Sequence, residues 1–331
     1  MHSCPDPAAG VRNPMIVFDL NDPSVQLPQD TVLVIGNFDA VHLGHSYLLS
    51  EARKIADEKG KKLAVLTIEP HPRRLFRPDD PPFRITPQDV KLERFEQENI
   101  DYVFVLPFTW EAAEQSAGGF VQEILRGKLV PAAIVVGDDF HFGHNRSGNI
   151  ETLRVSGFET HAIKLKTDPQ HGVISATRIR GLIQSGLLEE ANKLLGWDWM
   201  IEGTVQRGDQ RGRELGYPTA NVPLNETIHP SYGVYAAEVK IEGESEWHMA
   251  ATNIGIRPMF EVKIALVEAH ILDFSGDLYG KKLTIKPVKK IRNEEKFMTL
   301  DALIAQIEKD CAETREILNQ SEISRAAAVK A

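Results

Sequence analysis

The sequence predicts two folded parts: an α/β domain with a parallel sheet, then a small antiparallel β-barrel followed by a long helix. Between residues 31 and 195, short apolar runs alternate with amphipathic helical patterns, which is typical of a parallel sheet with helices on both faces. From residue 196 onward, strand-like segments separated by turn residues favour an antiparallel barrel. The boundary is expected near Gly196 and Trp197, after the last helical pattern of the first part.

The expected elements follow from the period of the apolar residues. Between residues 46 and 60 these residues fall on one helical stripe. The first part is predicted to hold strands at 31–36, 62–68, 101–105 and 133–137, and helices at 46–60, 87–99, 117–129, 177–185 and 188–195. The second part is predicted to hold strands at 201–206, 233–241, 247–255, 264–272 and 282–288, and a helix at 299–318. Ligands of parallel sheets bind at the carboxyl ends of strands, so the loops there are expected to share one edge.

The composition is that of an ordinary globular protein. The 331 residues carry a net charge of −9, which argues against a general nucleic-acid binder. Two cysteines, Cys4 and Cys311, imply no disulfide framework and fit a reducing cytoplasm. No apolar run approaches the length of a membrane span, and residues 1–14 are expected to form a flexible extension and not a signal peptide. The oligomeric state stays open.

The most informative motif is His42-Leu43-Gly44-His45, placed where a strand passes into a helix. A helix N-terminus presents unpaired backbone N–H groups and a positive dipole end, and therefore favours phosphate. Two imidazoles three residues apart can donate to phosphate oxygens whose charge grows during displacement at phosphorus. The alternatives are surface histidines, or a metal site formed by Asp39, His42 and His45, although no neighbouring Cys or carboxylate cluster completes it.

A second candidate phosphate site lies at residues 174–180. Ser175 or Thr177 can cap the helix that begins there, and the hydroxyls together with Arg178 and Arg180 can face a polyphosphate. An ordinary capped helix with basic surface residues is the alternative.

The loop at 135–149 follows a strand and is rich in Gly, Asp and aromatic residues, which suits the binding of a flat ring. We expect Phe140 to fill the core beneath the loop and Phe142 to contact the ligand.

The second part carries its own phosphate signature at 203–221. Gly208, Gly212 and Gly216 allow backbone amides to wrap phosphates. Thr219 and Asn221, two residues apart in an extended stretch, point the same way and can supply oxygens to Mg²⁺. The segment is not a Walker A motif, and as a bare pattern it is also compatible with a glycine-rich loop.

A candidate base lies in the strand expected at 264–272. Glu268 and His270 share one face of that strand, and this face begins apolar. A carboxylate entering an apolar lining can take the proton of a hydroxyl. The alternative is a solvent-facing Glu on a barrel strand.

Taken together, the motifs resemble those of the bacterial bifunctional riboflavin kinase/FAD synthetase family. The resemblance spans about residues 31–318. In chain order it is carried by G-N-F-D-x-V-H-x-G-H (36–45), E-P-H-P (69–72), V-G-D-D-F-x-F-G (136–143), I-S-x-T-x-I-R (174–180), G-x-x-x-G-R-x-L-G-x-P-T-A-N (208–221), N-I-G-x-R-P-x-F (253–260), E-x-H-x-x-D-F (268–274) and D-L-Y-G (277–280).

The resemblance implies a Rossmann-like nucleotidylyltransferase domain at 15–195 and a riboflavin kinase-like barrel at 196–331. It implies a multifunctional cytoplasmic transferase of FAD biosynthesis that phosphorylates riboflavin with ATP and then adenylylates FMN, releasing pyrophosphate. Its implied cofactor is Mg²⁺ and its partners are the small-molecule substrates ATP, riboflavin and FMN. The implied catalytic residues are His42, His45, Arg180 and Glu268.

The resemblance also implies binding residues. For ATP these are Asn37, Phe38, Gly44, Asp139, Ser175, Thr177, Arg178, Gly208, Arg213, Gly216 and Pro218; for the flavin, Phe76 and Phe142; and for the metal ion, Thr219 and Asn221.

Three positions depart from the family pattern. Ala40 replaces a Gly, and we expect its φ to be negative. Ala176 replaces a Ser, which is expected to weaken adenylyl transfer modestly, and Met259 replaces a Thr, which is expected to affect riboflavin affinity. Two other functions compete: a nucleotidylyltransferase for another cofactor precursor with a binding-only barrel, and a non-catalytic flavin sensor.

Overall fold

The structure is a computed structural model that describes residues 14–330 except 171, 209–211, 213, 214, 260 and 261; for 257–264 and 322–330 it describes the backbone alone. The predicted N-terminal extension therefore lies almost wholly outside the described residues. The chain forms two compact units, one up to Asp80 together with Gln88–Ile174, the other Pro81–Pro87 together with the chain from Ser175 onward. Each unit is described by itself below.

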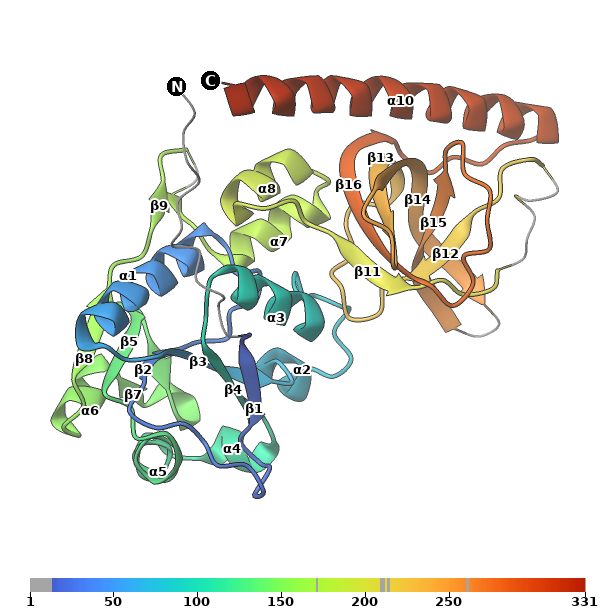
Figure 1. Ribbon diagram of the computed structural model, residues 1–331. Helices are drawn as coiled ribbons and strands as arrows, with labels where there is room; N and C mark the ends of the chain where they lie inside the picture. The colour runs from blue at the N-terminus through green and yellow to red at the C-terminus, as the bar shows by residue number, and fades with distance from the viewer. Residues whose placement is uncertain (1–13, 171, 209–211, 213–214, 260–261, 331) are drawn as a thin grey trace, which may run out of the picture. The chain divides into compact units, whose positions relative to one another are not determined.

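The first unit is built on a six-stranded parallel sheet with strand order β1-β4-β3-β2-β5-β8 (Figure 1). The strands are β1 (Ile16–Asp19), β2 (Val32–Ile35), β3 (Leu63–Glu69), β4 (Tyr102–Pro107), β5 (Ala133–Gly137) and β8 (Thr160–Ile163). Because all neighbours are parallel, the loops that follow β2, β3 and β5 lie at one edge of the sheet, as the sequence predicted.

Side chains alternate between two cores on the two faces of this sheet. Leu33, Ile35 and Leu66 point to one face, and Val34 and Val65 point to the other. Helices α1 (Leu43–Lys59) and α3 (Gln88–Gln97) pack on the second face, while a π-helix (η1, Phe120–Leu129) and α6 (Ile150–Val155) pack on the first. A sheet buried on both faces explains why its strands read as nearly continuous apolar runs.

The remaining elements of this unit are short. They are α2 (Pro72–Phe76), α4 (Trp110–Glu114), α5 (Ala117–Gly119), the 3₁₀ turn η2 (His144–Arg146) and the strands β6 (His141–Phe142), β7 (Gly148–Asn149), β9 (Thr167–Asp168) and β10 (Gly172–Val173). The single helix expected at 117–129 is instead the three-residue α5 followed by the wider η1, which ends at Val130 in a left-handed conformation.

The second unit contains an antiparallel six-stranded barrel with strand order β11-β16-β13-β14-β15-β12. Its strands are β11 (Ile201–Thr204), β12 (Ala220–Pro223), β13 (Gly233–Ile241), β14 (Trp247–Met259), β15 (Val262–Ile271) and β16 (Lys282–Arg292). The two terminal strands approach each other where Gln206 N–H donates to the Asn221 carbonyl at 2.8 Å, so the barrel is nearly closed. This confirms the predicted fold class.

Among the described residues, the barrel unit also contains α7 (Ala176–Gln184), α8 (Leu188–Leu195) and the long α10 (Leu300–Lys330), which crosses over the barrel in Figure 1. Ile317 and Leu318 of α10 pack on Ala236 of β13, and Cys311 packs near Ala251 of β14. Burial raises the pKa of the Cys311 thiol. Within the described residues, every helix is too short or too polar to cross a lipid bilayer.

A segment from the first half of the chain belongs to the barrel unit. Ile228 N–H donates to the Arg84 carbonyl at 2.8 Å, and the Trp199 indole donates to the Ile85 carbonyl at 3.2 Å. This segment (Pro81–Pro87), α7 and α8 all belong to the second compact unit. The second unit therefore includes residues that precede the domain boundary expected near residue 195.

Candidate active sites

The loop after β2 ends in an imidazole cap on helix α1. His42 is the N-cap residue, and its Nδ1 accepts the backbone N–H groups of Gly44 at 3.1 Å and His45 at 3.3 Å. Because Nδ1 accepts these bonds, the neutral ring carries its proton on Nε2 and can donate from that atom. The 5% exposed His42 thus presents a fixed donor at the edge of the sheet.

This cap corrects one expectation about the motif. The amides of Gly44 and His45 were expected to be open to phosphate, but they are bonded to His42. Gly44 has a different role, because a side-chain carbon there would lie only 3.0 Å from the His42 ring and would crowd it. The small residue is needed by the imidazole cap.

His45 completes a stack of rings. Its ring lies parallel to that of His42 at 3.8 Å and tilted against that of Phe38 at 5.0 Å. Its Nδ1 is buried with no hydrogen-bond partner among the described residues. Burial, and secondly the neighbouring His42, hold the pKa of His45 well below its usual value of 6.5. The ring is therefore neutral at pH 7. The alternative of a metal site at Asp39, His42 and His45 gains no support, because the described residues contain no group of three His, Cys, Asp or Glu placed to hold a metal ion.

The backbone between β2 and α1 is strained. Phe38, Ala40 and Val41 have φ values of 53°, 82° and 36°, in the left-handed region that L-residues rarely occupy. The expectation of a negative φ at Ala40 is therefore wrong. Strain of this kind collects at functional sites, where the surrounding structure holds it. Asn37, also in this loop, buries its side-chain Oδ1 with no partner in the described part of the chain.

Ala40→Gly is expected to raise the free energy of unfolding by roughly 0.5–1 kcal/mol. The left-handed conformation costs an L-residue about 1–2 kcal/mol, and the extra freedom of Gly in the unfolded chain offsets part of the relief. Urea unfolding of both proteins measures the change. A loss of stability would show that the methyl group of the fully buried Ala40 contributes more by packing than its backbone costs.

Of the two aromatic residues of the loop after β5, Phe142 does not have the ligand-facing position expected for it, while Phe140 packs against the core, as expected. Phe142 is 9% exposed and packs at 5.3 Å against Phe120 of η1, and a side chain at Gly148 would collide with its ring. Phe140 is less buried and stacks on Phe142 at 5.6 Å. The β6–β7 hairpin turns Phe142 into the core, so Phe142 is also a core residue. Asp139 is exposed, beside Gly137.

Phe76 belongs to an exposed aromatic cluster. It is 54% exposed, and its ring contacts those of Phe108 at 5.9 Å and Trp110 at 5.7 Å. Trp110 is itself 58% exposed. The cluster follows the carboxyl ends of β3 and β4, the edge that also carries the His42 loop. Sequence reasoning named Phe76 but missed Trp110.

In the second unit, the residues of the 174–180 motif open helix α7. Ser175 is the N-cap residue, and its Oγ accepts the backbone N–H of Arg178 at 3.4 Å. Thr177 and Arg178 are exposed. Arg180 donates from Nε to the Phe83 carbonyl at 3.0 Å and lies over the Phe83 ring, so the Pro81–Pro87 segment orients it.

Two cavities meet at the start of β12. One, of about 420 Å³, is lined by apolar groups such as Val234 and Leu303 and by Glu268. The other, of about 650 Å³, is lined by Arg207, Gly208 and Pro218 and by the 274–279 segment. Thr219 and Asn221 line both cavities. Their side chains therefore stand where the cavity that contains Glu268 adjoins the cavity that contains Gly208.

Close backbone approach shapes this junction. A side-chain carbon at Gly208 would lie 2.5 Å from the Asn221 amide, and one at Gly212 would lie 2.4 Å from the Tyr217 carbonyl. Gly216 has a φ of 85° and lines neither cavity, so it acts as a turn residue. Arg213 lies outside the described residues, and Met259 ends β14 with its side chain outside them.

Glu268 faces the smaller cavity from the middle of β15. Its backbone pairs with Asn221 on one side and with Asn253 on the other. Val267 and Ala269 point into the buried barrel core, as the alternation predicted. His270 shares the cavity face and donates from Nδ1 to the Pro218 carbonyl at 2.9 Å, which fixes the segment that leads to Thr219.

Helix α10 and the segment before it form a wall of this cavity, which sequence reasoning missed. Phe297, Leu303 and Ile307 line it. Arg292 at the end of β16 holds the helix by donating to both carboxylate oxygens of Asp310, at 2.8–3.1 Å. The helical pattern at 299–318 predicted a helix after the barrel, but not the cavity that this helix would line.

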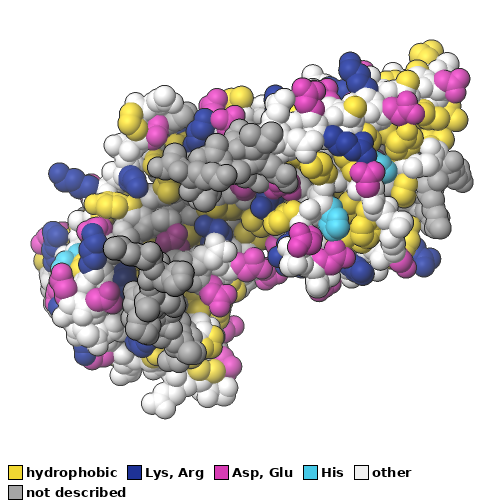
Figure 2. Space-filling model, turned by 45° about the horizontal axis from the view of Figure 1, so that its top comes forward, with side chains coloured by type: hydrophobic (Ala, Val, Ile, Leu, Met, Phe, Trp, Pro, Cys, Tyr) yellow, Lys and Arg dark blue, Asp and Glu magenta, His cyan; other side chains and the backbone are white. Residues whose placement is uncertain are grey.

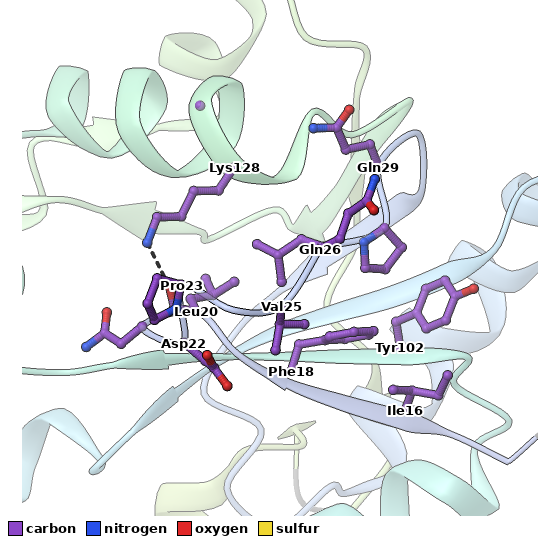
Figure 3. Close-up of a pocket in the computed structure, with 14 residues that line it drawn as sticks. Ile16, Phe18, Leu20, Asp22, Pro23, Val25, Gln26, Gln29, Tyr102 and Lys128 are labelled. Carbon is purple, nitrogen blue, oxygen red and sulfur yellow. Dashed lines mark hydrogen bonds between the residues drawn. The ribbon is translucent and has the colours of Figure 1, made fainter.

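Another cavity, of about 760 Å³, lies in the first unit beside β1 (Figure 3). Phe18 and Tyr102 lie side by side in it, and Lys128 donates to the Leu20 carbonyl at 2.7 Å. None of the predicted site residues lines it. On the face shown in Figure 2, the described Lys and Arg side chains are interspersed with Asp and Glu, without a continuous basic surface there.

Known proteins match both parts of the chain. A family model described as FAD synthetase matches residues 24–178, and one described as riboflavin kinase matches residues 195–318. The bifunctional riboflavin kinase/FMN adenylyltransferase of Escherichia coli (strain K12) is 39% identical over 295 residues, 88% of this chain and 94% of that protein. The protein of that name from Bacillus subtilis (strain 168) is 38% identical over 287 residues, 85% of this chain and 90% of that protein.

A solved structure shares the fold over nearly the whole chain. It is described as a macrolide-efflux protein from Streptococcus pneumoniae, is 31% identical, and matches with a TM-score of 0.81 over 91% of this chain and 99% of that chain. That description is of the other protein. The two family models and the E. coli and B. subtilis relatives agree on both halves of the sequence. The chain therefore belongs to the family of bifunctional riboflavin kinase/FMN adenylyltransferases.

Proposed function

We propose that the chain phosphorylates riboflavin to FMN with ATP and then adenylylates FMN to FAD, releasing pyrophosphate. The observation that carries the first reaction is the meeting of two cavities at Thr219 and Asn221. The smaller cavity offers Phe297, Leu303 and Ile307 to a flavin ring and polar groups such as Glu268 to its ribityl chain, and the cavity beside Gly208 suits the nucleotide. Family membership supports the second reaction together with the fixed imidazoles of His42 and His45.

In the proposed kinase reaction, the ribityl hydroxyl of riboflavin lies beside Glu268 in the smaller cavity. The hydroxyl is a poor nucleophile at neutral pH, and the carboxylate takes its proton as the oxygen bonds to the γ-phosphorus of ATP. ADP leaves toward the larger cavity, where Gly208 and Pro218 contact the nucleotide. Gly216 supports the turn between them, and Arg213 is proposed as a further ATP contact from the family motif.

Mg²⁺ fits the donor set at the junction of the two cavities. The Thr219 hydroxyl and the Asn221 amide oxygen are hard oxygen ligands, and Mg²⁺ usually completes its shell with phosphate oxygens and water. When bound there, the ion offsets negative charge on the transferring phosphoryl group. Asn221 is 9% exposed, and a side chain at position 208 would displace its amide, so Gly208 is needed to leave room for Asn221 at the junction.

In the proposed adenylyl transfer, a phosphate oxygen of FMN attacks the α-phosphorus of ATP and pyrophosphate departs. His42, from Nε2–H, and His45 donate to the phosphate oxygens as charge develops on them. Residues proposed to bind ATP are Asn37, Phe38, Gly44, Asp139, Ser175, Thr177 and Arg178, with Arg180 as a further catalytic cation. Phe76 is proposed to contact the flavin. Phe142 is buried, and we propose that it supports the loop from the core instead of contacting the flavin.

The competing functions are not favoured. A barrel used for binding alone conflicts with the riboflavin kinase family match over residues 195–318. A flavin sensor needs neither Glu268 in the cavity nor two stacked imidazoles. We propose that 15–195 carry adenylylation and 196–331 carry phosphorylation, and that the enzyme works in the cytoplasm, where the buried thiol of Cys311 stays reduced.

Incubation of the purified chain with ATP, Mg²⁺ and riboflavin tests this function. Chromatographic separation is expected to show FMN first and then FAD, with ADP and pyrophosphate as co-products. FMN without FAD would contradict the adenylyltransferase half, and unchanged riboflavin would contradict the kinase half. Supplying FMN in place of riboflavin measures the second reaction separately.

A further inference from the structure

A buried ion pair lies under the loop that carries His42 and His45. Lys91 of α3 is 1% exposed, and its Nζ donates to the Glu69 carboxylate at 2.5 Å. Burying two charges costs desolvation that their attraction does not reliably offset, and an apolar pair of similar volume is often at least as stable. Stability alone therefore does not account for this pair.

The Thr67 hydroxyl extends the pair to the site loop. Lys91 Nζ also donates to Thr67 Oγ1 at 3.0 Å, and Thr67 donates its own proton to the Asn37 carbonyl at 3.2 Å. Because Thr67 and Glu69 are two residues apart on β3, both face the side of the sheet that α3 covers. A directed chain of hydrogen bonds thus runs from a buried cation to the backbone of Asn37.

Helix α3 holds the same loop at a second point. Phe95, four residues after Lys91, packs edge-on against Phe38 at 5.3 Å. Phe38 in turn contacts the His45 ring at 5.0 Å. The positive φ values of this loop persist where surrounding structure imposes them, and α3 contributes to this through Phe95 directly and through Lys91 by way of Thr67.

We propose that Lys91 is a positioning residue for adenylyl transfer, which it supports by holding Asn37 through the Thr67 hydroxyl while Glu69 balances its charge. This inference rests on the proposed function of the His42–His45 site. The Asn37 side chain keeps a buried Oδ1 without a partner among the described residues, so a small rotation of its backbone redirects an acceptor that a nucleotide can use. Misplacement of a binding group by about 1 Å can cost a hundredfold in rate.

The first test removes the pair as a unit. Lys91→Met combined with Glu69→Leu removes both charges of the pair together, so the double variant is expected to unfold at or above the wild-type temperature. Its kcat for FMN adenylylation is expected to fall roughly tenfold to a hundredfold, with a smaller change in the KM for ATP. Riboflavin phosphorylation, measured on the same preparation, should stay within about twofold because it belongs to the barrel.

A second test keeps the ion pair and breaks its link to the loop. Thr67→Val removes the hydroxyl at constant shape and is expected to show the same loss of kcat, whereas Thr67→Ser keeps the hydroxyl and should restore most of the activity. If the double variant fails to fold, the comparison of Thr67→Val with Thr67→Ser still tests the proposal. Adenylylation within about twofold of wild type in Thr67→Val would overturn the proposal, since misplacement of the loop should cost more. A wild-type protein that does not adenylylate FMN would contradict the proposed function itself.

Discussion

Glu268→Gln is expected to lower the turnover of riboflavin phosphorylation by roughly two to four orders of magnitude, the usual contribution of a general base. The amide keeps the shape and hydrogen bonding of the side chain but cannot take the proton of the ribityl hydroxyl. Glu268 stands in the wall of the smaller cavity, the proposed riboflavin site, with its backbone paired to that of Asn221. ATP affinity should change little, because the nucleotide chamber lies on the other side of Thr219 and Asn221. Paired assays measure riboflavin to FMN and FMN to FAD on one preparation.

Adenylylation of supplied FMN by the Glu268→Gln variant should survive, since that reaction is assigned to the other half of the chain. Glu246→Gln, at an exposed position of the same barrel, is the matched control and should leave both reactions unchanged. Near wild-type phosphorylation in Glu268→Gln would remove Glu268 as the base and return it to the role of an ordinary polar residue on a barrel strand.

His45→Ala is expected to reduce FAD formation from FMN by roughly two to three orders of magnitude, because one preorganised donor to the transition state typically contributes about 3–4 kcal/mol. Riboflavin phosphorylation should stay nearly intact. Because the pKa of His45 lies well below 6.5, the ring is neutral throughout the range from pH 7 to pH 8. The ratio of wild-type to variant rates should therefore be the same at both pH values.

The matched control for His45 is His161→Ala, which removes a half-exposed imidazole of the same unit that pairs with Glu159. It should leave both activities unchanged. Equal loss of phosphorylation and adenylylation in His45→Ala would indicate that the ring acts through folding, by its packing between His42 and Phe38. A rate ratio that rises as the pH falls from 8 to 7 would indicate that the protonated ring is the active form.

Local periodicity predicted the elements well. The helix at 188–195 and the strands at 133–137 and 233–241 have the expected bounds, because each is a short apolar pattern with clear turn residues beside it. The same alternation placed Glu268 and His270 on the face of β15 opposite Val267 and Ala269. Family motifs then identified both halves of the chain, and the matches to known proteins confirm the family.

Packing between distant segments could not be predicted from local sequence patterns in the same way. The sequence placed Phe140 in the core and Phe142 at the ligand, but pairing in the β6–β7 hairpin goes with the burial of Phe142 in the same core. The pattern of β3 shows Thr67 and Glu69 on one face, but not that Lys91, more than twenty residues later, is buried against them. Nor does a helical stripe reveal that α10 walls the cavity.

The sequence by itself determined the order of the two folds, the passage from strand to helix around His42 and His45, and the faces of the barrel strands, because these depend on residues within a few positions of one another. The tertiary structure alone decided the left-handed φ of Ala40, the use of His42 as a cap, and the meeting of two cavities at Asn221. Those features arise where segments far apart in the chain constrain one another's backbone and exclude water together, and no local pattern of residues encodes that geometry.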